Sequence, residues 1–399
     1  MSPEPRVLLA DADAFYVAVA RMVDPEGAGQ AELLIVGGAA ESRGVVCSAS
    51  YETRKYGVRS AMPIARALRL CPGATCVPVP RKECSRKSAE IRAVLQRFSP
   101  VVEGASIDEW YLDLGGTEAL YKWESLADTA RRIRAAVREK VGLSISIGGG
   151  TNKLVAKLAV ELAKPKPGND ATGVHIVEPG TEAEFMLRFN LADIPLIGPK
   201  FQQRLHRAGL RTVGHVLEQD LASLIRWFGD REGRWLYDRV RGIDRGQVAP
   251  REEPKSISRE DTFPHDVSTD VELERTLLAL AARAGADLRH EGLSTRTITV
   301  KLRDADFSTR QASHTLDERV ISDRVIFETA RSLLRRLRAA RRRPARLLGV
   351  SLSSLVADSQ PAQLALFDSS GTGPPPLESA RDRALARAVD QIRAVERGN

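Results

Sequence analysis

Two short segments of the sequence place carboxylates where an apolar strand would be expected to continue. In the first, VLLA leads into DADAFY, so Asp11 and Asp13 lie two residues apart and on the same face of a strand. In the second, SIDEW, Asp108 and Glu109 are adjacent, so on a regular strand they point to opposite faces. Both could serve one site only at a turn or bulge. Acids at strand ends are seldom buried unless they are paired or bind a cation.

Converging carboxylates suit hard divalent cations, and Mg²⁺ in particular is usually held by few carboxylates together with the phosphates of a substrate. Two such ions, roughly 3.5–4 Å apart, can activate an attacking oxygen and stabilise a leaving one. Either acidic motif alone is more often a set of surface acids in a turn. Their apolar strand settings argue against that interpretation and favour a site for divalent cations.

A phosphate-bearing substrate would also need cations from the protein. Lys153, Lys157 and Lys164 are separated by four and seven residues, so they share one face of a helix. The segment YETRK adds Tyr51, Arg54 and Lys55. Basic residues on a helix are more often simply solvated. This set therefore indicates a phosphate site only in combination with the acidic motifs.

The N-terminal half must position these residues through an α+β domain. Residues 5–115 alternate strand-like runs with helical stretches, and VVEGASIDEWYLDL is typical of a β-hairpin. LSISIGGG predicts a strand that enters a glycine-rich turn at 148–150, followed by a helix over 152–164 that ends before Pro165. The glycines do not form a Walker P-loop, because the G-x-x-x-x-G-K-[ST] spacing is absent.

The next region, 172–242, is helical in character. LADIPLIGPKFQQRLHRAGLRTVGHVLE predicts a short helix, a turn at Gly198 and Pro199, and a second helix. This is the pattern of a helix-hairpin-helix, whose turn amides can hold a DNA phosphate without reading bases. Similar turns also join ordinary helices. The charged, proline-bearing segment 246–255 then predicts an interdomain linker.

Beyond the linker, TRTITVKLR alternates between apolar and polar residues. Ile298, Val300 and Leu302 share one strand face, which predicts a sheet packed on helices with its other face toward solvent or a charged ligand. RLLGVSLSSL is the expected partner strand. After Asp358 the composition predicts a flexible stretch and then a short amphipathic helix.

Composition limits the class of protein without deciding it. A chain of 399 residues predicts about two to four domains. No apolar stretch reaches the roughly 20 residues that span a bilayer, and no signal peptide is recognisable, so we expect a cytoplasmic protein with no membrane partner. The net charge is +8, and basic residues cluster at 81–87, 131–140 and 331–346. This charge fits a polyanionic partner and solvated helix faces equally well.

Together these segments resemble the Y-family of DNA polymerases, most closely the DNA polymerase IV branch. Nine segments carry the resemblance in order between residues 6 and 356. They are DADAFY, RGVVCSASYETRKYGVRSAMP, CPGA, SIDEWYLDL, GGGTNKLVAKLAVELAKPKPG, DIPLIGPK, KSISREDTF, TVKLRDADFSTR and RLLGVSLSSL.

The resemblance implies a multidomain α+β fold in the form of a polymerase right hand. The parts are a ferredoxin-like palm, small fingers, a helix-hairpin-helix thumb and an α/β little finger. The implied boundaries are 1–15 and 81–171 for the palm, 16–80 for the fingers, 172–242 for the thumb, 243–255 for a linker, 256–357 for the little finger and 358–399 for a flexible tail.

The resemblance also implies the site residues. Asp11, Asp108 and Glu109 would bind two Mg²⁺ ions with help from the Ala12 carbonyl, while Asp13 would only support the strand. Tyr16 matches the position of a steric gate against a ribose 2′-hydroxyl. The residues that match nucleotide-binding positions are Phe15, Tyr16, Ser48, Tyr51, Arg54 and Lys164.

The implied activity is template-directed, low-fidelity DNA synthesis past lesions, using primer-template DNA and dNTPs, by a monomer without a proofreading exonuclease. QLALF resembles the pentapeptide that binds the bacterial β sliding clamp. Its docking residues would be Gln363, Leu364, Leu366 and Phe367.

Two other classes of protein share some of these features. One is a non-catalytic, polymerase-like accessory protein that binds DNA and clamp, but such proteins typically lack the acidic set. The other is a nucleotide cyclase with a related palm, in which the thumb and little finger would have no purpose. The sequence departs from the family pattern at Ala20, at Trp110 and in the Cys84-Ser85 region.

Overall fold

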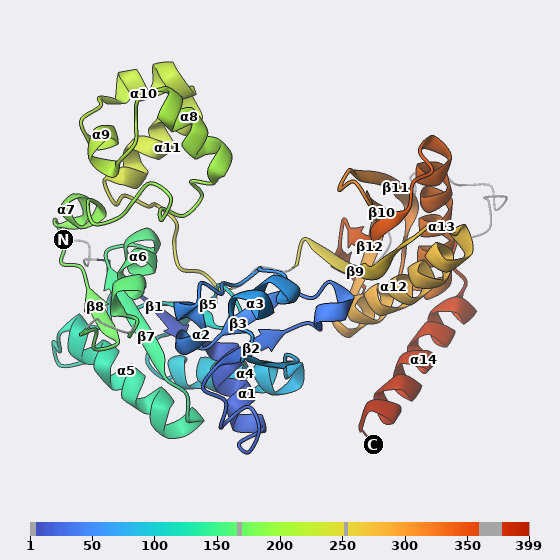
Figure 1. Ribbon diagram of the computed structural model, residues 1–399, viewed down its shortest axis with the longest axis horizontal. Coiled ribbons are helices and arrows are strands. Elements are labelled where there is room, and N and C mark those ends of the chain that lie inside the picture. Colours follow the sequence, from blue (N-terminus) through green and yellow to red (C-terminus); the bar gives the residue numbers. More distant parts are fainter. Residues whose placement is uncertain (1–4, 166–169, 251–253, 359–376, 399) are drawn as a thin grey trace, which may run out of the picture. The chain divides into compact units, whose positions relative to one another are not determined.

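In a computed structural model the chain divides into two compact units (Figure 1). The first contains residues Met1–Ala40 and Gly44–Arg251, and the second consists mainly of 252–399. The structure describes residues 5–165, 170–250, 254–358 and 377–398. Among the helices in these ranges, none has the length and apolar character needed to cross a membrane.

The first unit is built on a five-stranded sheet with the order β5-β6-β1-β7-β8. Its central strand β1 runs antiparallel to both neighbours, β6 and β7. Helices α4 and α5 cover one face and α6 the other. The bounds are β1 Val7–Ala12, β5 Val101–Gly104, β6 Glu109–Asp113, β7 Ile145–Gly150, β8 Val174–Ile176, α4 Arg81–Leu95, α5 Leu126–Val141 and α6 Lys153–Ala163.

Alternation along β1 decides which face each side chain meets. Leu8 and Ala10 pack into the core formed with α4 and α5, whereas Val7 and Leu9 pack against α6. With a period of two, Asp11 follows Val7 and Leu9 onto the face covered by α6. The strand therefore delivers its acid to the side of the sheet that carries the lysine helix.

The glycines at 148–150 belong to strand β7, so the expectation of a glycine-rich turn is wrong. Gly148 is needed because α6 lies almost in backbone contact with this strand. A Cβ on Gly148 would come within 2.1 Å of the Val160 nitrogen and 2.4 Å of the Ala156 oxygen. Glycine here permits a close approach of helix to strand and thereby sets the position of α6.

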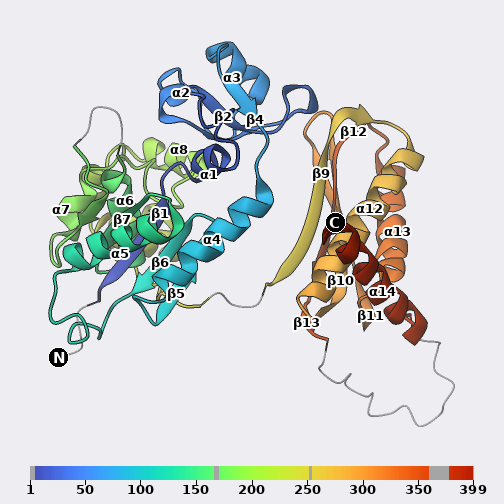
Figure 2. The same cartoon turned by 90° about the horizontal axis from the view of Figure 1, so that it is seen from below.

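A smaller three-stranded sheet, β3-β2-β4, follows the first strand in sequence and has its own core around Ile35 and Ile64 (Figure 2). Ser50 caps helix α2 by accepting from the Thr53 nitrogen. The bounds are α1 Phe15–Val23, β2 Leu34–Gly37, η1 Ala40–Ser42, β3 Val46–Ala49, α2 Tyr51–Lys55, α3 Ile64–Leu70 and β4 Thr75–Val77.

Helices α7 to α11 form the rest of the first unit within the described residues. They share a core that includes Leu205, Leu224 and Leu236 and also reaches residues of α6. The short helix expected before Gly198 is replaced by turns over 191–197, and the helix begins at Pro199, whose ring suits the first helical turn. The bounds are α7 Glu182–Met186, α8 Pro199–Arg207, α9 Val213–Leu217, α10 Leu221–Phe228 and α11 Asp230–Val240.

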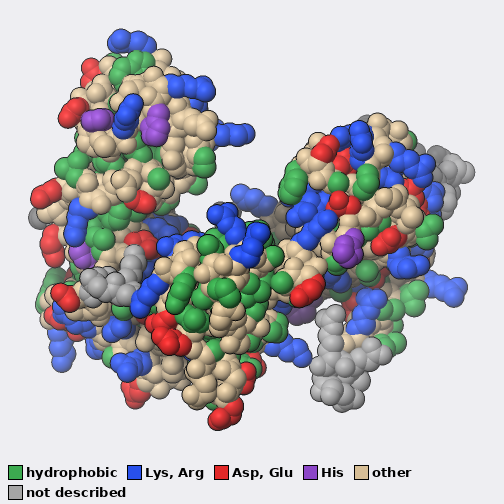
Figure 3. Space-filling view, viewed as in Figure 1, with side chains coloured by type: hydrophobic (Ala, Val, Ile, Leu, Met, Phe, Trp, Pro, Cys, Tyr) green, Lys and Arg blue, Asp and Glu red, His purple; other side chains and the backbone are tan. Residues whose placement is uncertain are grey.

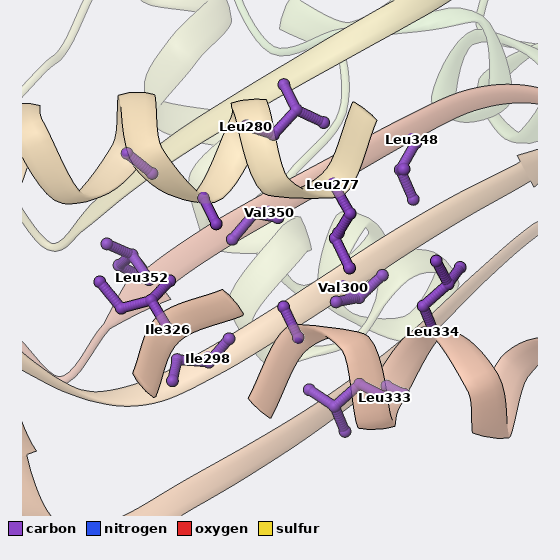
Figure 4. Close-up of a cluster of buried hydrophobic side chains, with 14 of the residues drawn as sticks. Leu277, Leu280, Ile298, Val300, Ile326, Leu333, Leu334, Leu348, Val350 and Leu352 are labelled. Carbon is purple, nitrogen blue, oxygen red and sulfur yellow. The ribbon is translucent and has the colours of Figure 1, made fainter. Parts of the chain in front are cut away.

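The second unit has a four-stranded antiparallel sheet, β11-β10-β12-β9, with the short β13 beside β10. The predicted alternation is confirmed, because Ile298, Val300 and Leu302 are buried in one core with residues of α12 and α13. Figure 4 shows Ile298 and Val300 in this core. RLLGVSLSSL supplies the partner strand β12, as expected. The bounds are β9 Ser256–Val267, α12 Asp270–His290, β10 Leu293–Asp304, β11 Thr309–Val320, α13 Asp323–Ala340, β12 Ala345–Ser353 and β13 Val356–Ala357.

The amphipathic helix expected near the C-terminus is α14, Ala380–Gly398, and ion pairs attach it to this second unit. The Arg289 side chain is 5% exposed and donates to Asp390 at 2.6 and 2.9 Å and to Asp323 at 2.7 Å. Arg324 forms a second fork on Asp382, with both N–O distances 2.9 Å. The helix is therefore fixed to α12 and α13 by charge-assisted hydrogen bonds.

Candidate active site

Strand pairing brings two of the predicted acids together. Asp11 on β1 and Glu109 on β6 are directly opposite each other in the register of the sheet, so their side chains share one face. Asp11 is only 6% exposed. Burial, together with the neighbouring Glu109 carboxylate and against the pull of Lys164, raises the pKa of Asp11 to about 7. Two carboxylates held this close favour a cation between them or beside them.

The lysine face of α6 supplies positive charge to this pair. The Lys164 ammonium lies 2.8 Å from an Asp11 carboxylate oxygen, and the Lys157 ammonium bonds to Glu109. Burial acts to raise the pKa of Glu109. The hydrogen bonds and charges around this carboxylate, first those of Lys157, outweigh burial and lower the pKa below its usual value. Lys157 on α6 and Lys164, the residue that follows the helix, therefore meet the acid pair, whereas Lys153 pairs with Glu103. Phosphate binding by these lysines stays a prediction.

Asp108 does not join the two other carboxylates in this structure. It lies in the bend between β5 and β6, where its carboxylate accepts from the Ser106 hydroxyl. Its carbonyl accepts from the Ala12 nitrogen at 2.9 Å, so the bend is tied to the end of β1. The expectation of a turn at this point is therefore met. Within the described ranges, no three His, Cys, Asp or Glu side chains converge closely enough to hold a metal ion.

Asp13 has a separate partner. It follows the end of β1, and its carboxylate accepts a hydrogen bond of 2.7 Å from the Ser146 hydroxyl on β7. Its backbone nitrogen donates to the Ser144 carbonyl at 3.0 Å. These bonds tie the chain to β7 after Asp11, which matches the supporting role expected for Asp13.

Two aromatic residues begin helix α1 directly after the acidic strand. Phe15 is buried and Tyr16 is half-buried, with their rings edge to face at a centroid distance of 5.7 Å. The turn into the helix uses Ala14 with φ of 44°, a left-handed conformation that is unusual for alanine. Burial first, and then the charge of Asp108, raises the pKa of Tyr16, so its phenol lies within electrostatic reach of Asp108.

The predicted nucleotide contacts come from the neighbouring β3 and α2. Ser48 is buried on β3, and the Arg54 guanidinium lies 5.1 Å from the centre of the Tyr51 ring. Arg54 also donates to the Ala49 carbonyl at 2.9 Å, which orients its planar head. Burial raises the pKa of Tyr51, and the charges of Asp13, Arg54 and Lys164 act on it as well. Tyr51 therefore lies within electrostatic reach of Asp11 and Asp13.

The donor set fits a hard divalent cation. Asp11 and Glu109 offer two adjacent carboxylates, and the Ala12 backbone and the Asp108 side chain lie one residue away along their chains. All of these donors are oxygens, the type that Mg²⁺ prefers.

The pairing of Lys157 with Glu109 was not predicted from the sequence. The sequence predicts the helix face on which Lys157 lies. It contains no signal for how far α6 is shifted along β6, and this shift decides which acid Lys157 meets. The close contact at Gly148 sets this shift. The signal in the sequence is a strand glycine before an amphipathic helix, a pattern that also predicts a turn.

The basic clusters are partly neutralised by acids of the same unit. On the face drawn in Figure 3, Lys and Arg side chains are spread among Asp and Glu. In the cluster 331–346, three arginines form ion pairs of 2.7 to 2.9 Å. These pairs are Arg335–Glu274, Arg338–Asp270 and Arg341–Asp304. The clamp-binding residues predicted at 363–367 lie outside the described residues.

A palm-like sheet with paired acids, a small second sheet, a helical group and a separate α/β unit together form the architecture of a Y-family DNA polymerase. A chimeric Y-family polymerase built from Dbh and Dpo4 matches with a TM-score of 0.76 at 24% identity, over 88% of this chain and 99% of that one. An insertion ternary complex of Dbh DNA polymerase matches with a TM-score of 0.60 at 24% identity, over 87% and 98%.

Sequence comparison narrows the class. Residues 10–161 match the impB/mucB/samB family, 192–244 the DNA polymerase-iota thumb domain, and 254–366 the impB/mucB/samB C-terminal domain. DNA polymerase IV of Alkalilimnicola ehrlichii is 37% identical over 91% of this chain and 99% of its own length. That of Desulfatibacillum aliphaticivorans is 36% identical over 97% and 93%. The chain belongs to the DNA polymerase IV family of translesion DNA polymerases, and it is a DNA-directed DNA polymerase.

Proposed function

We propose that the face shared by Asp11 and Glu109 is the place where this polymerase adds a dNTP to a primer 3′-hydroxyl. The observation that carries the proposal is the direct pairing of these two acids across β1 and β6 with lysines of α6 beside them. Asp108, in the adjoining bend, and the Ala12 carbonyl would complete the ligands of two Mg²⁺ ions. When bound, these ions supply Lewis-acid activation of the attacking oxygen and neutralise the charge of the triphosphate.

The protein's own contribution is to position the substrate and to supply fixed charge. Arg54 can grip a phosphate with two parallel hydrogen bonds, whereas Lys164 acts as a point charge. Tyr51 and Ser48 can donate hydroxyl hydrogen bonds to phosphate oxygens. Phe15, which is buried in the core, would lie under the incoming nucleotide.

Tyr16 is proposed as the gate that excludes ribonucleotides. Its ring follows the acidic strand and leans edge-on against the buried Phe15, which limits how far it can move. A ribose 2′-hydroxyl would collide with such a ring, while deoxyribose would fit. A small fingers region leaves the nascent base pair open to solvent, which suits low-fidelity synthesis across damaged templates.

Binding to DNA and clamp extends the proposal beyond the acid pair. The solvent face of the second unit's sheet carries hydroxyls that bond across strands, such as Thr299 to Ser313 at 2.8 Å, and such a polar face suits a DNA backbone.

The QLALF segment is proposed to bind the β sliding clamp. Its removal should abolish clamp-stimulated synthesis and spare basal synthesis. We expect a monomer acting on chromosomal DNA in the cytoplasm.

Primer extension tests the proposal. Glu109→Gln keeps the shape of the side chain and removes its charge, so Mg²⁺-dependent extension should fall by at least about a thousandfold, within the range seen when one group of a catalytic unit is removed. DNA affinity, measured by fluorescence anisotropy, should stay unchanged. Glu103→Gln is the matched control, because Glu103 also pairs with a lysine of α6 but faces Tyr111 and no second acid. Equal activity of the two variants would refute the assignment.

A further inference from the structure

Lys157 is held beside the acid pair by the packing of its helix. Because Gly148 has no side chain, α6 lies in near-backbone contact with β7. The Lys157 ammonium then meets Glu109 on β6. Both side chains are mostly shielded from water, with exposures of 29% for Lys157 and 23% for Glu109. A lysine whose spacing suggested a triphosphate contact is instead directed at a metal ligand.

The acid pair needs this positive charge when nothing else is bound. Asp11 and Glu109 face each other across the two strands, and like charges at facing positions destabilise a sheet. Lys164 lies on the Asp11 side of the pair, and Lys157 on the Glu109 side. Water screens these charges less than it would on an open surface, because the site is largely buried.

Resting on the proposed two-metal function, we propose that Lys157 holds the place of a divalent cation at Glu109 in the metal-free enzyme and competes with that cation for the carboxylate. It is a positioning residue, since it acts through Glu109. A metal ion that binds Glu109 must displace or repel the ammonium. The phosphates of an incoming nucleotide add metal ligands and so tip this competition toward the metal.

Lys153 provides a matched control on the same helix. Its ammonium lies 2.6 Å from a Glu103 oxygen, and both side chains are 21% exposed, close to the values for the Lys157 pair. Glu103 faces Tyr111 across the strands and therefore has no acidic neighbour in register. Removing either lysine breaks one half-buried ion pair, but only the loss of Lys157 changes the charge next to the paired acids.

Metal binding by the full-length protein, without DNA or nucleotide, tests the inference. Mn²⁺ is titrated and the free ion is measured by electron paramagnetic resonance. Lys157→Met should bind Mn²⁺ about tenfold more tightly than wild type, the size of effect that outer-shell groups have on metal affinity. Lys157→Arg, which keeps the charge, and Lys153→Met should both bind as wild type does.

Thermal unfolding separates this role from simple support of the fold. In EDTA, Lys157→Met should unfold at a lower temperature than wild type, and saturating Mn²⁺ should remove the difference. For Lys153→Met any difference should be the same with and without metal. Unchanged or weaker Mn²⁺ binding by Lys157→Met, or a deficit that metal does not correct, would overturn the inference. Failure of the wild type to extend a primer would instead refute the proposed function.

Discussion

Substitution of Gly148 by alanine should push the lysine helix away from the catalytic sheet. The added Cβ would stand 2.1 Å from the Val160 nitrogen, whereas ordinary contact begins at 3.4 Å, so α6 must withdraw by about 1.3 Å. Backbone atoms of a helix cannot turn aside as a flexible side chain can. The helix would move as a body, and Lys157 and Lys164 would move with it.

Two magnitudes follow from this displacement. Overpacking of this kind costs about 1–3 kcal/mol of the free energy of unfolding. For a unit of this size, each kcal/mol lowers Tm by about 2–4 °C. The Lys164–Asp11 distance of 2.8 Å would lengthen toward 4 Å, at which the direct bond is lost. Misplacement of a catalytic group by about 1 Å can lower a rate on the order of 100-fold. The kcat for primer extension should therefore fall by up to about 100-fold.

The assay combines thermal unfolding with single-nucleotide primer extension under saturating dNTP. Gly104→Ala is the control, because Gly104 lies in β5 of the same sheet and its added Cβ would have its nearest neighbour, a Trp110 carbon, at 4.0 Å. Gly104→Ala should keep wild-type Tm and kcat. If Gly148→Ala does so as well, then close packing at Gly148 does not position the lysine helix, and the reasoning fails.

Three further predictions concern single residues. Tyr16→Ala should admit ribonucleotides, and unchanged discrimination in steady-state kinetics would exclude Tyr16 as the gate. Asp11→Asn should abolish synthesis yet preserve or raise Tm at pH 8. Since burial raises the folded-state pKa of Asp11 to about 7, its charge costs stability that grows from about pH 4 to pH 7, so the advantage of asparagine should be smaller at pH 5. Arg289→Met should cost about 3–5 kcal/mol, because Asp390 and Asp323 lose their partner; unchanged hydrogen exchange in α14 would argue against that anchor.

The sequence predicted what depends on local pattern. The apolar run VLLA predicts that Asp11 lies at a strand end, the segment VVEGASIDEWYLDL predicts a hairpin around Glu109, and strict alternation predicts the strand that carries Ile298. The turn at Asp108 followed from the impossibility of two adjacent acids sharing a strand face.

Features that depend on long-range packing could not be predicted in this way. The role of Gly148 comes from a helix that approaches it in the folded state, and the Lys157–Glu109 pair joins residues 48 positions apart. Arg289 and Asp390 are separated by 101 positions. Such partners are chosen by the relative placement of whole elements, and neither charge nor period in the sequence specifies that placement.

The attachment of α14 gives the proposed clamp motif two fixed ends. Asp358 before it is bonded to Arg383, and the Leu377 nitrogen after it donates to Glu318, all within the second unit. A fully stretched chain covers about 3.4 Å per residue, so the segment between these ends can carry its midpoint no farther than roughly 30 Å from them. A motif at a free chain end would have about twice that reach. A clamp bound to this doubly attached segment would stay next to the second unit. The enzyme would then remain within a few nanometres of the clamp until the enzyme binds a primer end.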